Sequence, residues 1–358
     1  MPDQDALHAG QERAGARFTP IGGESTPFDF GDVDGEYDAL RRGAGLLDLS
    51  FRAKLRFTGA DRVAFLQNML TNDIQSLQPG RGCRALKLTV QGKMEAALHV
   101  LCFDTEIGCD LEPAPVQTLV LGLRRRILRD DVQIEDVSAS WKLFSVQGPA
   151  AGGALAALGI DASRQHESLA HAEAQLAGVD VRVVRTDHAG AGGFDIWVPS
   201  TAAARVWEVI HAAAAVRPVG LAALDIRRIE AGIPWHGKEI TTDHFPQEAG
   251  LEDGWISYTK GCYLGQETIA RIHHMGHVNR CLRGLILEAE SPPPPRSRLV
   301  SAGREVGEVT SSALLPRLAR PVALAYIRSE HALAGTQLVV VSGSERWPCG
   351  VRVLPLQV

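Results

Sequence analysis

The feature that most constrains the fold is a change of pattern near residue 280. Beyond it, short segments alternate apolar and polar residues, at 282–287, 304–310, 322–328 and 338–341. A period of two is typical of strands that bury one face. The last part of the chain therefore predicts an all-β domain, with the proline run at 292–295 as a rigid loop between two of its strands.

Upstream of this change, helical and extended patterns alternate. The clearest helix is predicted over 220–232, where Leu221, Leu224 and Ile229 point inward and Gly232 is a natural stop. Two predicted strands, 85–90 and 95–103, flank a hairpin turn. Because 358 residues exceed the usual size of one domain, we expect two or three domains, mixed α and β before residue 280 and all-β after it.

Charge and composition argue against several kinds of partner. The 37 Lys and Arg residues are outnumbered by 42 Asp and Glu residues, and the formal net charge of −5 offers no bulk attraction for nucleic acid or an anionic membrane. No apolar run approaches the roughly 18 residues that a membrane span needs. Residues 1–28 are polar, Gly-rich and unlike a signal peptide, so we expect a mobile arm on a cytoplasmic protein.

Common catalytic motifs are missing. The chain has no Walker loop, no GxGxxG after a strand, no HExxH and no GxSxG, which argues against nucleotide, zinc-protease and serine-hydrolase chemistry. His273 and His277 have the spacing of metal ligands only if a helix continues through Gly276, so we expect no metal site. The six cysteines form no CxxC pair, which predicts reduced thiols.

The most informative stretch is 258–271, YTKGCYLGQETIAR. Two glycines flank its Cys-Tyr pair and would let the backbone approach a ligand closely. Lys260 could favour the thiolate of Cys262 if the chain folds back, and a helix beginning near Gly265 would add its positive end. The alternatives are a buried, inert Cys262 and an intrahelical salt bridge between Glu267 and Arg271.

This stretch resembles a known family. KGCYLGQE resembles the fingerprint of the YgfZ family of folate-binding proteins, which are relatives of the glycine cleavage system T-protein. LDLSFRAKLRFTGADRVAFLQNMLTNDI, GLAALDIRRIEAGIPWHGKEITTDHFPQEAGLE and GREVGEVTSSALLPRLARPVALAYIR are similar to further segments of these proteins. The resemblance runs from about residue 30 to the end.

The resemblance implies three domains around a central channel that binds tetrahydrofolate. Residues 29–54 and 138–279 would form a split α+β domain, 55–137 an inserted α+β domain and 280–358 a C-terminal β-barrel. Glu230 maps onto the glutamate that holds the pterin, and a carboxylate can accept two parallel hydrogen bonds from an aminopterin edge. Asn72, in a turn that lies beside the folate in relatives, is a second binding candidate. The alternatives are a surface charge for Glu230 and a helix end for Asn72.

The same resemblance leaves the function open between two classes. T-proteins use an Asp pair in a GGxxDD hairpin, and here Ala96 and Ala97 occupy the Asp positions, with Glu95 as a neighbouring carboxylate. We therefore expect a tetrahydrofolate-binding accessory protein that supports iron–sulfur cluster enzymes or assembly factors. In it Cys262 would react, Lys260 would tune it, and a nearby wall would be shaped by Tyr263, Gln266, Glu267 and Arg271. The alternatives are an aminomethyltransferase or demethylase of the T-protein type, and a folate-binding scaffold without chemistry.

Overall fold

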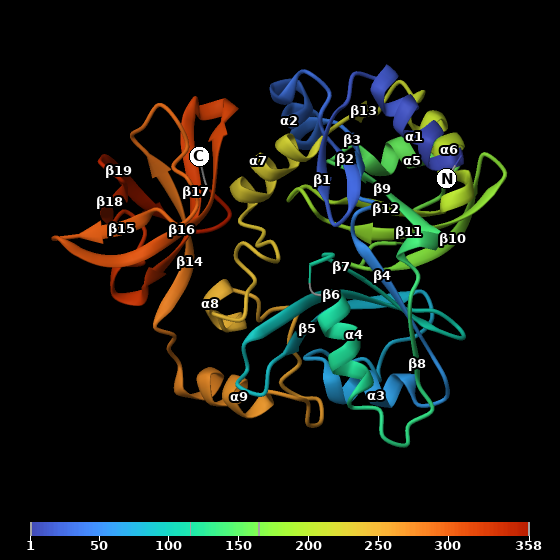
Figure 1. The fold of residues 1–358 in the computed structure, drawn as a ribbon, viewed down its shortest axis with the longest axis horizontal. Helices are drawn as coiled ribbons and strands as arrows, with labels where there is room; N and C mark the ends of the chain where they lie inside the picture. The colour runs from blue at the N-terminus through green and yellow to red at the C-terminus, as the bar shows by residue number, and fades with distance from the viewer. Residues whose placement is uncertain (1, 115, 164, 357–358) are drawn as a thin grey trace.

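Figure 1 shows the computed structural model, in which three lobes meet around the middle of the molecule. It describes residues 2–114, 116–163 and 165–356. The β-structures of the three lobes are a six-stranded sheet, a five-stranded sheet and a closed six-stranded barrel. The fold is therefore α+β with a C-terminal β-barrel, as the sequence predicts.

The first lobe holds the six-stranded sheet, in the order β10–β11–β12–β9–β3–β13. Its strands are β3 (Gly45–Asp48), β9 (Trp141–Gln147), β10 (His171–Leu176), β11 (Val179–Thr186), β12 (Gly193–Pro199) and β13 (Arg217–Pro218). Helices α2 (Val33–Arg42), α5 (Ala151–Ala157) and α6 (Ala203–His211) belong to the same lobe, as do the short 3-10 helices η1 (Ser138–Ser140) and η2 (Ser200–Ala202). Phe144, Phe194 and Trp207 fill the core of this lobe.

The segment that we expected to be a mobile arm is folded onto this lobe. It forms α1 (Pro2–Arg13) and a hairpin of β1 (Arg17–Ile21) and β2 (Glu24–Asp29). Leu7 is buried in the core of the lobe, and Gln11 Nε2 donates a hydrogen bond of 2.7 Å to Asp48 Oδ2. The sequence did not reveal this because one leucine and one amide, which find partners far along the chain, make no periodic pattern.

The second lobe holds the five-stranded sheet, in the order β5–β6–β7–β4–β8. Its elements are β4 (Ala53–Thr58), α3 (Arg62–Met69), β5 (Arg81–Leu88), β6 (Met94–Cys102), β7 (Ile107–Leu111), α4 (Val116–Arg124) and β8 (Gln133–Asp136). The predicted hairpin joins β5 to β6 and turns at Gly92, whose φ of 83° requires the freedom of glycine. The chain then returns to the first lobe at β9.

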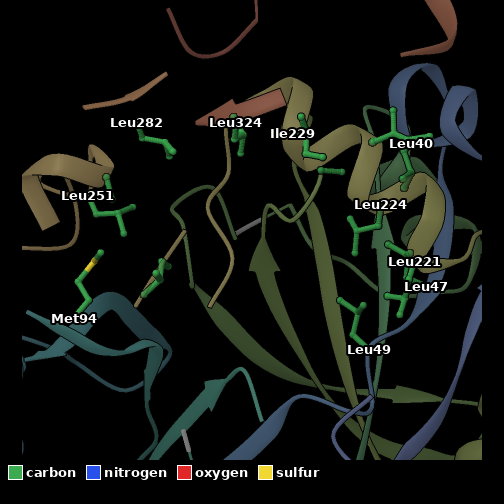
Figure 2. Packing of buried hydrophobic residues seen from close by; sticks show 14 of the residues in the cluster. Leu40, Leu47, Leu49, Met94, Leu221, Leu224, Ile229, Leu251, Leu282 and Leu324 are labelled. Carbon is green, nitrogen blue, oxygen red and sulfur yellow. The ribbon is translucent and has the colours of Figure 1, made fainter. Parts of the chain in front are cut away.

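Helix α7 (Leu221–Ala231) passes between the first lobe and the barrel (Figure 1). Gly220 precedes it, and Gly232, in the left-handed region at φ 73°, ends it, as the sequence predicts. Figure 2 shows Leu221 and Leu224 of α7 beside Leu47 and Leu49 of the first lobe. The same continuous core includes residues of the second lobe and the barrel, so the three lobes share one hydrophobic contact region.

After α7 the chain passes through two helices and then enters the barrel. Short α8 (Pro246–Ala249) and α9 (Gln266–Met275) precede strands that close in the order β14–β17–β16–β15–β18–β19. These strands and their 3-10 turns are β14 (Arg280–Leu287), β15 (Arg298–Ser301), β16 (Arg304–Leu315), η3 (Pro316–Leu318), β17 (Arg320–Arg328), η4 (Ser329–His331), β18 (Gln337–Ser342) and β19 (Glu345–Arg352). In the described part of the chain, no helix combines the length and apolar character that crossing a bilayer requires.

Candidate functional site

A cavity of about 440 Å³ lies where the three lobes meet. The first lobe lines it with the β11–β12 connection, the second with β5 and β6, and the barrel with Pro355 after its last strand. The end of α7 and the segment after it complete the wall. The titratable lining residues are Arg52, Arg84, His99, Glu112, Asp187, His188, Arg228, His236 and Asp253.

A buried ion pair fixes the part of the wall that follows α7. Arg228 donates from Nη1 to Glu239 Oε2 at 2.9 Å, and both side chains are almost completely buried. Glu239 also accepts hydrogen bonds from the Trp235 amide at 2.9 Å, Thr310 Oγ1 at 2.7 Å and Ser311 Oγ at 2.5 Å. One carboxylate thus joins α7, the following loop and strand β16 of the barrel.

Two indoles give the cavity aromatic walls. Trp235 lies under the guanidinium of Arg228, 5.2 Å from the ring centroid, and Trp255 lies under that of Arg84, at 5.4 Å. Both side chains are only partly buried, so ring surface remains open to the cavity. Broad rings with cationic groups behind them suit a flat, electron-rich ligand.

His236 adds a polar group without a partner. Its Nε2 lies 3.0 Å from the backbone oxygen of Glu95, while its buried Nδ1 has no hydrogen-bond partner among the described residues. A buried polar atom of this kind costs about 1–3 kcal/mol when it stays unsatisfied. The wall therefore favours a ligand that can hydrogen-bond to it.

Alternate side chains of strand β6 face the cavity and the core of the second lobe. Ala97 and His99 line the cavity, whereas Ala96 is fully buried in the core behind them. Glu95 shares the cavity-side face, but its Oε2 pairs with Lys87 Nζ at 2.6 Å and it lines a separate hollow of about 830 Å³. His236 and Ile240 line both spaces, so the two hollows are neighbours.

His99 stands against a carboxylate that is already neutralised. Its Nδ1 lies 3.3 Å from Asp110 Oδ2, without a well-directed hydrogen bond. Asp110 accepts two hydrogen bonds of 2.9 Å from Arg52 Nε, and Arg52 also pairs with Glu112. Burial alone would raise the pKa of Asp110, but the Arg52 charge holds it well below its ordinary value.

His188, on the β11–β12 connection, faces His99 with 5.8 Å between ring centroids. Its Nε2 lies 2.9 Å from Asp195 Oδ2, and the Asp195 Oδ1 accepts a hydrogen bond of 2.6 Å from Ser145 Oγ. Burial lowers the pKa of His188, but the Asp195 carboxylate outweighs it and the pKa is raised. The two histidines of the wall therefore differ in their electrostatic surroundings.

Comparisons with known proteins agree with this architecture. The family model of the GCVT N-terminal domain matches residues 7–257, and that of the glycine cleavage T-protein C-terminal barrel domain matches residues 280–356. Together they cover most of the chain. The chain belongs to the glycine cleavage T-protein family.

Individual T-protein relatives match over nearly their whole length. A Streptomyces coelicolor aminomethyltransferase is 31% identical over 345 residues, covering 94% of this chain and 92% of the relative. One from Thermosynechococcus vestitus is 30% identical, covering 93% and 90%. The crystal structure of the glycine cleavage system aminomethyltransferase T from Bartonella henselae superimposes with a TM-score of 0.88 at 25% identity, covering 98% of this chain and 96% of that one. These matches establish the T-protein family as a whole and do not single out its YgfZ branch.

Glu230, our candidate pterin anchor within this T-protein fold, has other partners. Its carboxylate accepts hydrogen bonds from Tyr37 Oη at 3.1 Å and Arg317 Nε at 2.6 Å, and it pairs with Arg227. It is not among the described residues that line the cavity. The helical period explains this placement, because Leu224, Arg228 and Ala231 take the cavity side of α7 and leave Arg227 and Glu230 turned toward α2.

Asn72, the second binding candidate, is committed to the backbone. Its Nδ2 donates to Arg84 O at 2.8 Å and Gly254 O at 3.0 Å, and its Oδ1 accepts from the Asp73 amide. The side chain thus ties the end of α3 to β5 and to the segment at 254. It supports the cavity wall near Trp255 without lining the cavity itself.

Lys260, which the sequence suggested as the group that tunes Cys262, has three backbone partners in the structure. Its Nζ donates to the backbone oxygens of Gln67 at 2.7 Å, Leu70 at 2.8 Å and Asn72 at 2.6 Å. An ammonium has three donors, so all three are used on the C-terminal end of α3. Burial lowers the pKa of Lys260 to about 8.

The two glycines of KGCYLGQE differ: Gly265 approaches protein, whereas a Cβ on Gly261 would meet no atom within 4 Å. A Cβ on Gly265, at φ 85°, would lie 2.6 Å from the backbone oxygen of Thr89 and 3.3 Å from Gly92 Cα. The Leu264 amide donates to Asn68 O at 3.1 Å. The segment is therefore a clamp on the second lobe, and Cys262, within the segment, is exposed rather than buried.

The remaining predicted wall residues are spread around the start of α9. Tyr263 is buried, burial raises its pKa to about 12, and its hydroxyl has no hydrogen-bond partner in the described ranges. Gln266 accepts from the Tyr263 amide at 3.4 Å, while Glu267 and Arg271 are exposed on α9. None of these four is among the described residues that line the central cavity.

The histidines near residue 275 do not form a metal site in the structure. Helix α9 ends at Gly276, so the helical spacing of His273 and His277 is broken. His273 stacks on Tyr258, with 3.8 Å between ring centroids. Within residues 2–114, 116–163 and 165–356, no cluster of three or more His, Cys, Asp or Glu side chains could hold a metal ion.

Sequence reasoning missed the cavity histidines and both tryptophans. His99, His188 and Trp255 lie outside the segments that resemble the family, and Trp235 lies inside one of them without having been singled out. The only usable signal was His99 in the predicted strand 95–103, two positions after Ala97 and so on the same face.

Proposed function

We propose that this chain binds a reduced folate in the central cavity and takes part in transfer of a one-carbon unit, as a protein of the aminomethyltransferase type. The observation that carries the proposal is the cavity itself, walled by Trp235 and Trp255, in a fold whose relatives bear that name. The proposal extends the names of these relatives to this chain on the strength of similarity over most of its length.

The residues of the cavity fit a pterin. Its flat ring system can stack on an indole, and a buried Nδ1 of His236 awaits a hydrogen-bonding group. Asp253, a lining carboxylate, can accept two parallel hydrogen bonds from an aminopyrimidine edge. A reduced folate, when bound, supplies the secondary amine nitrogens that carry a one-carbon unit.

The protein's own groups then orient and protect the reacting atoms. The Glu239 ion-pair network holds Trp235 in place, and Asn72 holds the segment before Trp255. Ala97 leaves space where a T-protein carboxylate would stand, so charge and proton acceptors must come from neighbouring residues. Two such residues of β6 share the strand face of Ala97, namely Glu95 and His99, and of these His99 lines the cavity whereas Glu95 pairs with Lys87.

Calorimetric titration of tetrahydrofolate into wild-type protein and Trp255→Leu tests the binding proposal. We expect the variant to bind at least tenfold more weakly, which corresponds to about 1.4 kcal/mol. Trp347→Leu, in the barrel, is the matched control and should retain wild-type affinity. Absence of binding to the wild type would refute the proposal. Formation of methylenetetrahydrofolate from a carrier-bound aminomethyl group would then test the transfer itself.

A second candidate function follows from Cys262. This thiol is exposed in KGCYLGQE, the segment that resembles YgfZ proteins, and an accessory role toward iron–sulfur proteins would use it. One thiolate is too few for a cluster, which usually needs about four ligands, so a client protein would have to supply the others. Full rescue of cluster-enzyme activity in a deletion strain by Cys262→Ala would exclude a role for the thiol.

A further inference from the structure

Two histidines face each other across the cavity wall. His99 comes from β6 of the second lobe and His188 from the β11–β12 connection of the first. Their ring centroids are 5.8 Å apart and the rings are tilted by 37°. The two side chains therefore meet only because the lobes are packed together.

The carboxylates behind the rings are not equivalent. Asp110, behind His99, is held through two oxygens by the Arg52 guanidinium, with a further contact of 2.7 Å from Nη2. Asp195, behind His188, receives a hydrogen bond from the Ser145 hydroxyl besides the imidazole, and no arginine or lysine of the described residues donates to it. A carboxylate whose charge is balanced by arginine gives a histidine little reason to hold a proton, whereas one without a cation favours the imidazolium.

The charged groups that face the pair act in both directions, since Asp110 favours a proton on His99 and Arg52 opposes one on His188, but their balance differs between the two rings. His99 faces Asp110 of β7, Arg52 before β4 and His188, while the uncharged Trp255 lies 6.4 Å away. His188 faces Asp195 of β12 most closely, with Arg52 and Asp110 beyond it. Burial lowers the pKa of His99, and Asp195 raises that of His188 against the effect of burial. Groups whose environments separate their protonation in this way are typical of acid–base partners.

We infer that His99 and His188 form a proton-transfer pair for the reaction in the cavity. This inference rests on the proposed one-carbon transfer. The Nε2 of His99 accepts the proton that an incoming amine loses, and Nδ1 of His188 donates a proton to the amine that leaves. These are the ring nitrogens that the two carboxylates leave available.

The exchange balances without an oxidant or reductant. In the first exchange a C–N bond forms to the incoming folate amine, and the C–N bond to the leaving amine breaks with its electron pair kept by the leaving nitrogen. Ring closure follows, in which a second folate amine forms the other C–N bond, the bond from carbon to the carrier breaks with its electron pair kept by the carrier, and the proton that this amine loses passes to the carrier. During the first exchange one proton passes to His99 and one leaves His188, so the pair ends with its protonation reversed. Return of a proton from His99 to His188 restores the starting state.

Histidine ring resonances test the pair independently of turnover. In ¹⁵N-labelled wild-type protein, assigned with His99→Gln and His188→Gln, we expect His188 to remain protonated at a pH where His99 is neutral. Replacing Asp195 by Asn should lower the pKa of His188 and leave His99 nearly unchanged. Equal titration of both rings near the ordinary histidine value of about 6.5 would overturn the inference.

Single-turnover transfer to tetrahydrofolate supplies the second test. Each Gln variant should bind folate within threefold of wild type yet react about 10²-fold more slowly. Loss of His99 should remove the acidic limb of the pH–rate profile, and loss of His188 the alkaline limb, while His277→Gln, an exposed control, keeps both. Wild-type rates in both variants would overturn the pair. If the wild type neither binds folate nor transfers, the proposed function fails, and the ring titrations alone decide the pair.

Discussion

The KGCYLGQE segment and the cavity wall differ in how recognisable their residues are in the sequence and in what those residues do in the structure. The segment carries the most recognisable residues of the sequence, yet Lys260 and Gly265 serve to hold the second lobe. The wall carries titratable side chains in unusual surroundings, yet His99 and His188 belong to no motif. The comparison teaches that a conspicuous sequence pattern can mark a joint between domains, while the residues suited to chemistry are assembled from distant places.

The buried network behind the wall should give the largest effect on stability. Glu239→Ala would leave Arg228 with Asp225 as its remaining carboxylate partner and would release three further donors, so we expect the free energy of unfolding to fall by about 3–5 kcal/mol. Urea denaturation measures this loss. Glu305→Ala, in a 4.0 Å exposed pair with Arg298, is the matched control and should stay within about 0.5 kcal/mol of wild type.

Glu230→Ala should come next and decides whether this residue acts mainly in folding. It would leave Arg227 and Arg317 without their shared carboxylate, and we expect a loss of about 3 kcal/mol in the same denaturation experiment. Calorimetry at a temperature where the variant is folded should show folate affinity within threefold of wild type. A tenfold loss of affinity would restore the pterin-anchor role that the sequence suggested.

Lys260→Met probes the clamp directly. It removes three charge-assisted hydrogen bonds from the end of α3, and we expect the free energy of unfolding to fall by about 2 kcal/mol. The reactivity of Cys262 toward a thiol reagent should stay unchanged, because the Lys260 ammonium donates to backbone oxygens at the end of α3. A clear slowing of that reaction would show that the lysine does tune the thiol, and would reverse our comparison.

The pH dependence of the free energy of unfolding should report the protonation of the two histidines in the cavity wall. Asp195 raises the folded-state pKa of His188 above the unfolded value of about 6.5. The ion pair therefore adds fully to the free energy of unfolding below that value, and this stabilisation is lost as the pH rises through the folded-state pKa. His99, whose pKa burial lowers, contributes above about pH 6.5, and that contribution is lost as the pH falls through its folded pKa. Denaturation of His188→Gln between about pH 5.5 and 8.5 should lack the alkaline decline that wild type shows. Identical profiles would contradict the His188–Asp195 ion pair.

Cys262→Ala should have the smallest effect on stability, within about 0.5 kcal/mol, because the side chain is exposed. In the native protein its thiol should react with a thiol reagent before the buried Cys102, Cys109 and Cys349. The variant should therefore lose the fastest phase of the reaction. Retention of that phase would assign it to another cysteine and weaken the second candidate function.

Much of the fold could be predicted because its signals are local. The barrel follows from alternation after residue 280, and α7 from its inward leucines and terminal Gly232. The folded N-terminus could not be predicted, since its stability depends on Leu7 and Gln11 reaching partners far along the chain.

The site was less accessible to sequence reasoning. Period-two alternation predicts that His99 shares a face with Ala97, but nothing local places His188 opposite it. Glu230 shows the complementary case. Its type and position matched a binding residue, yet its partners in the structure are Tyr37 and Arg317. Both lie far from it in the sequence, so no local pattern predicts these contacts.

The contact between Gly265 and the β5–β6 turn has a mechanical consequence. At this point one peptide backbone rests on another, so the spacing there is a fixed thickness that no rotamer change can alter. The turn lies at the tip of a long hairpin, and His99 lies farther along the same strand. A single methyl group at residue 265 would push the tip of the hairpin away from the start of α9, and any tilt of the hairpin would change the distance between the two imidazoles without a contact to either one.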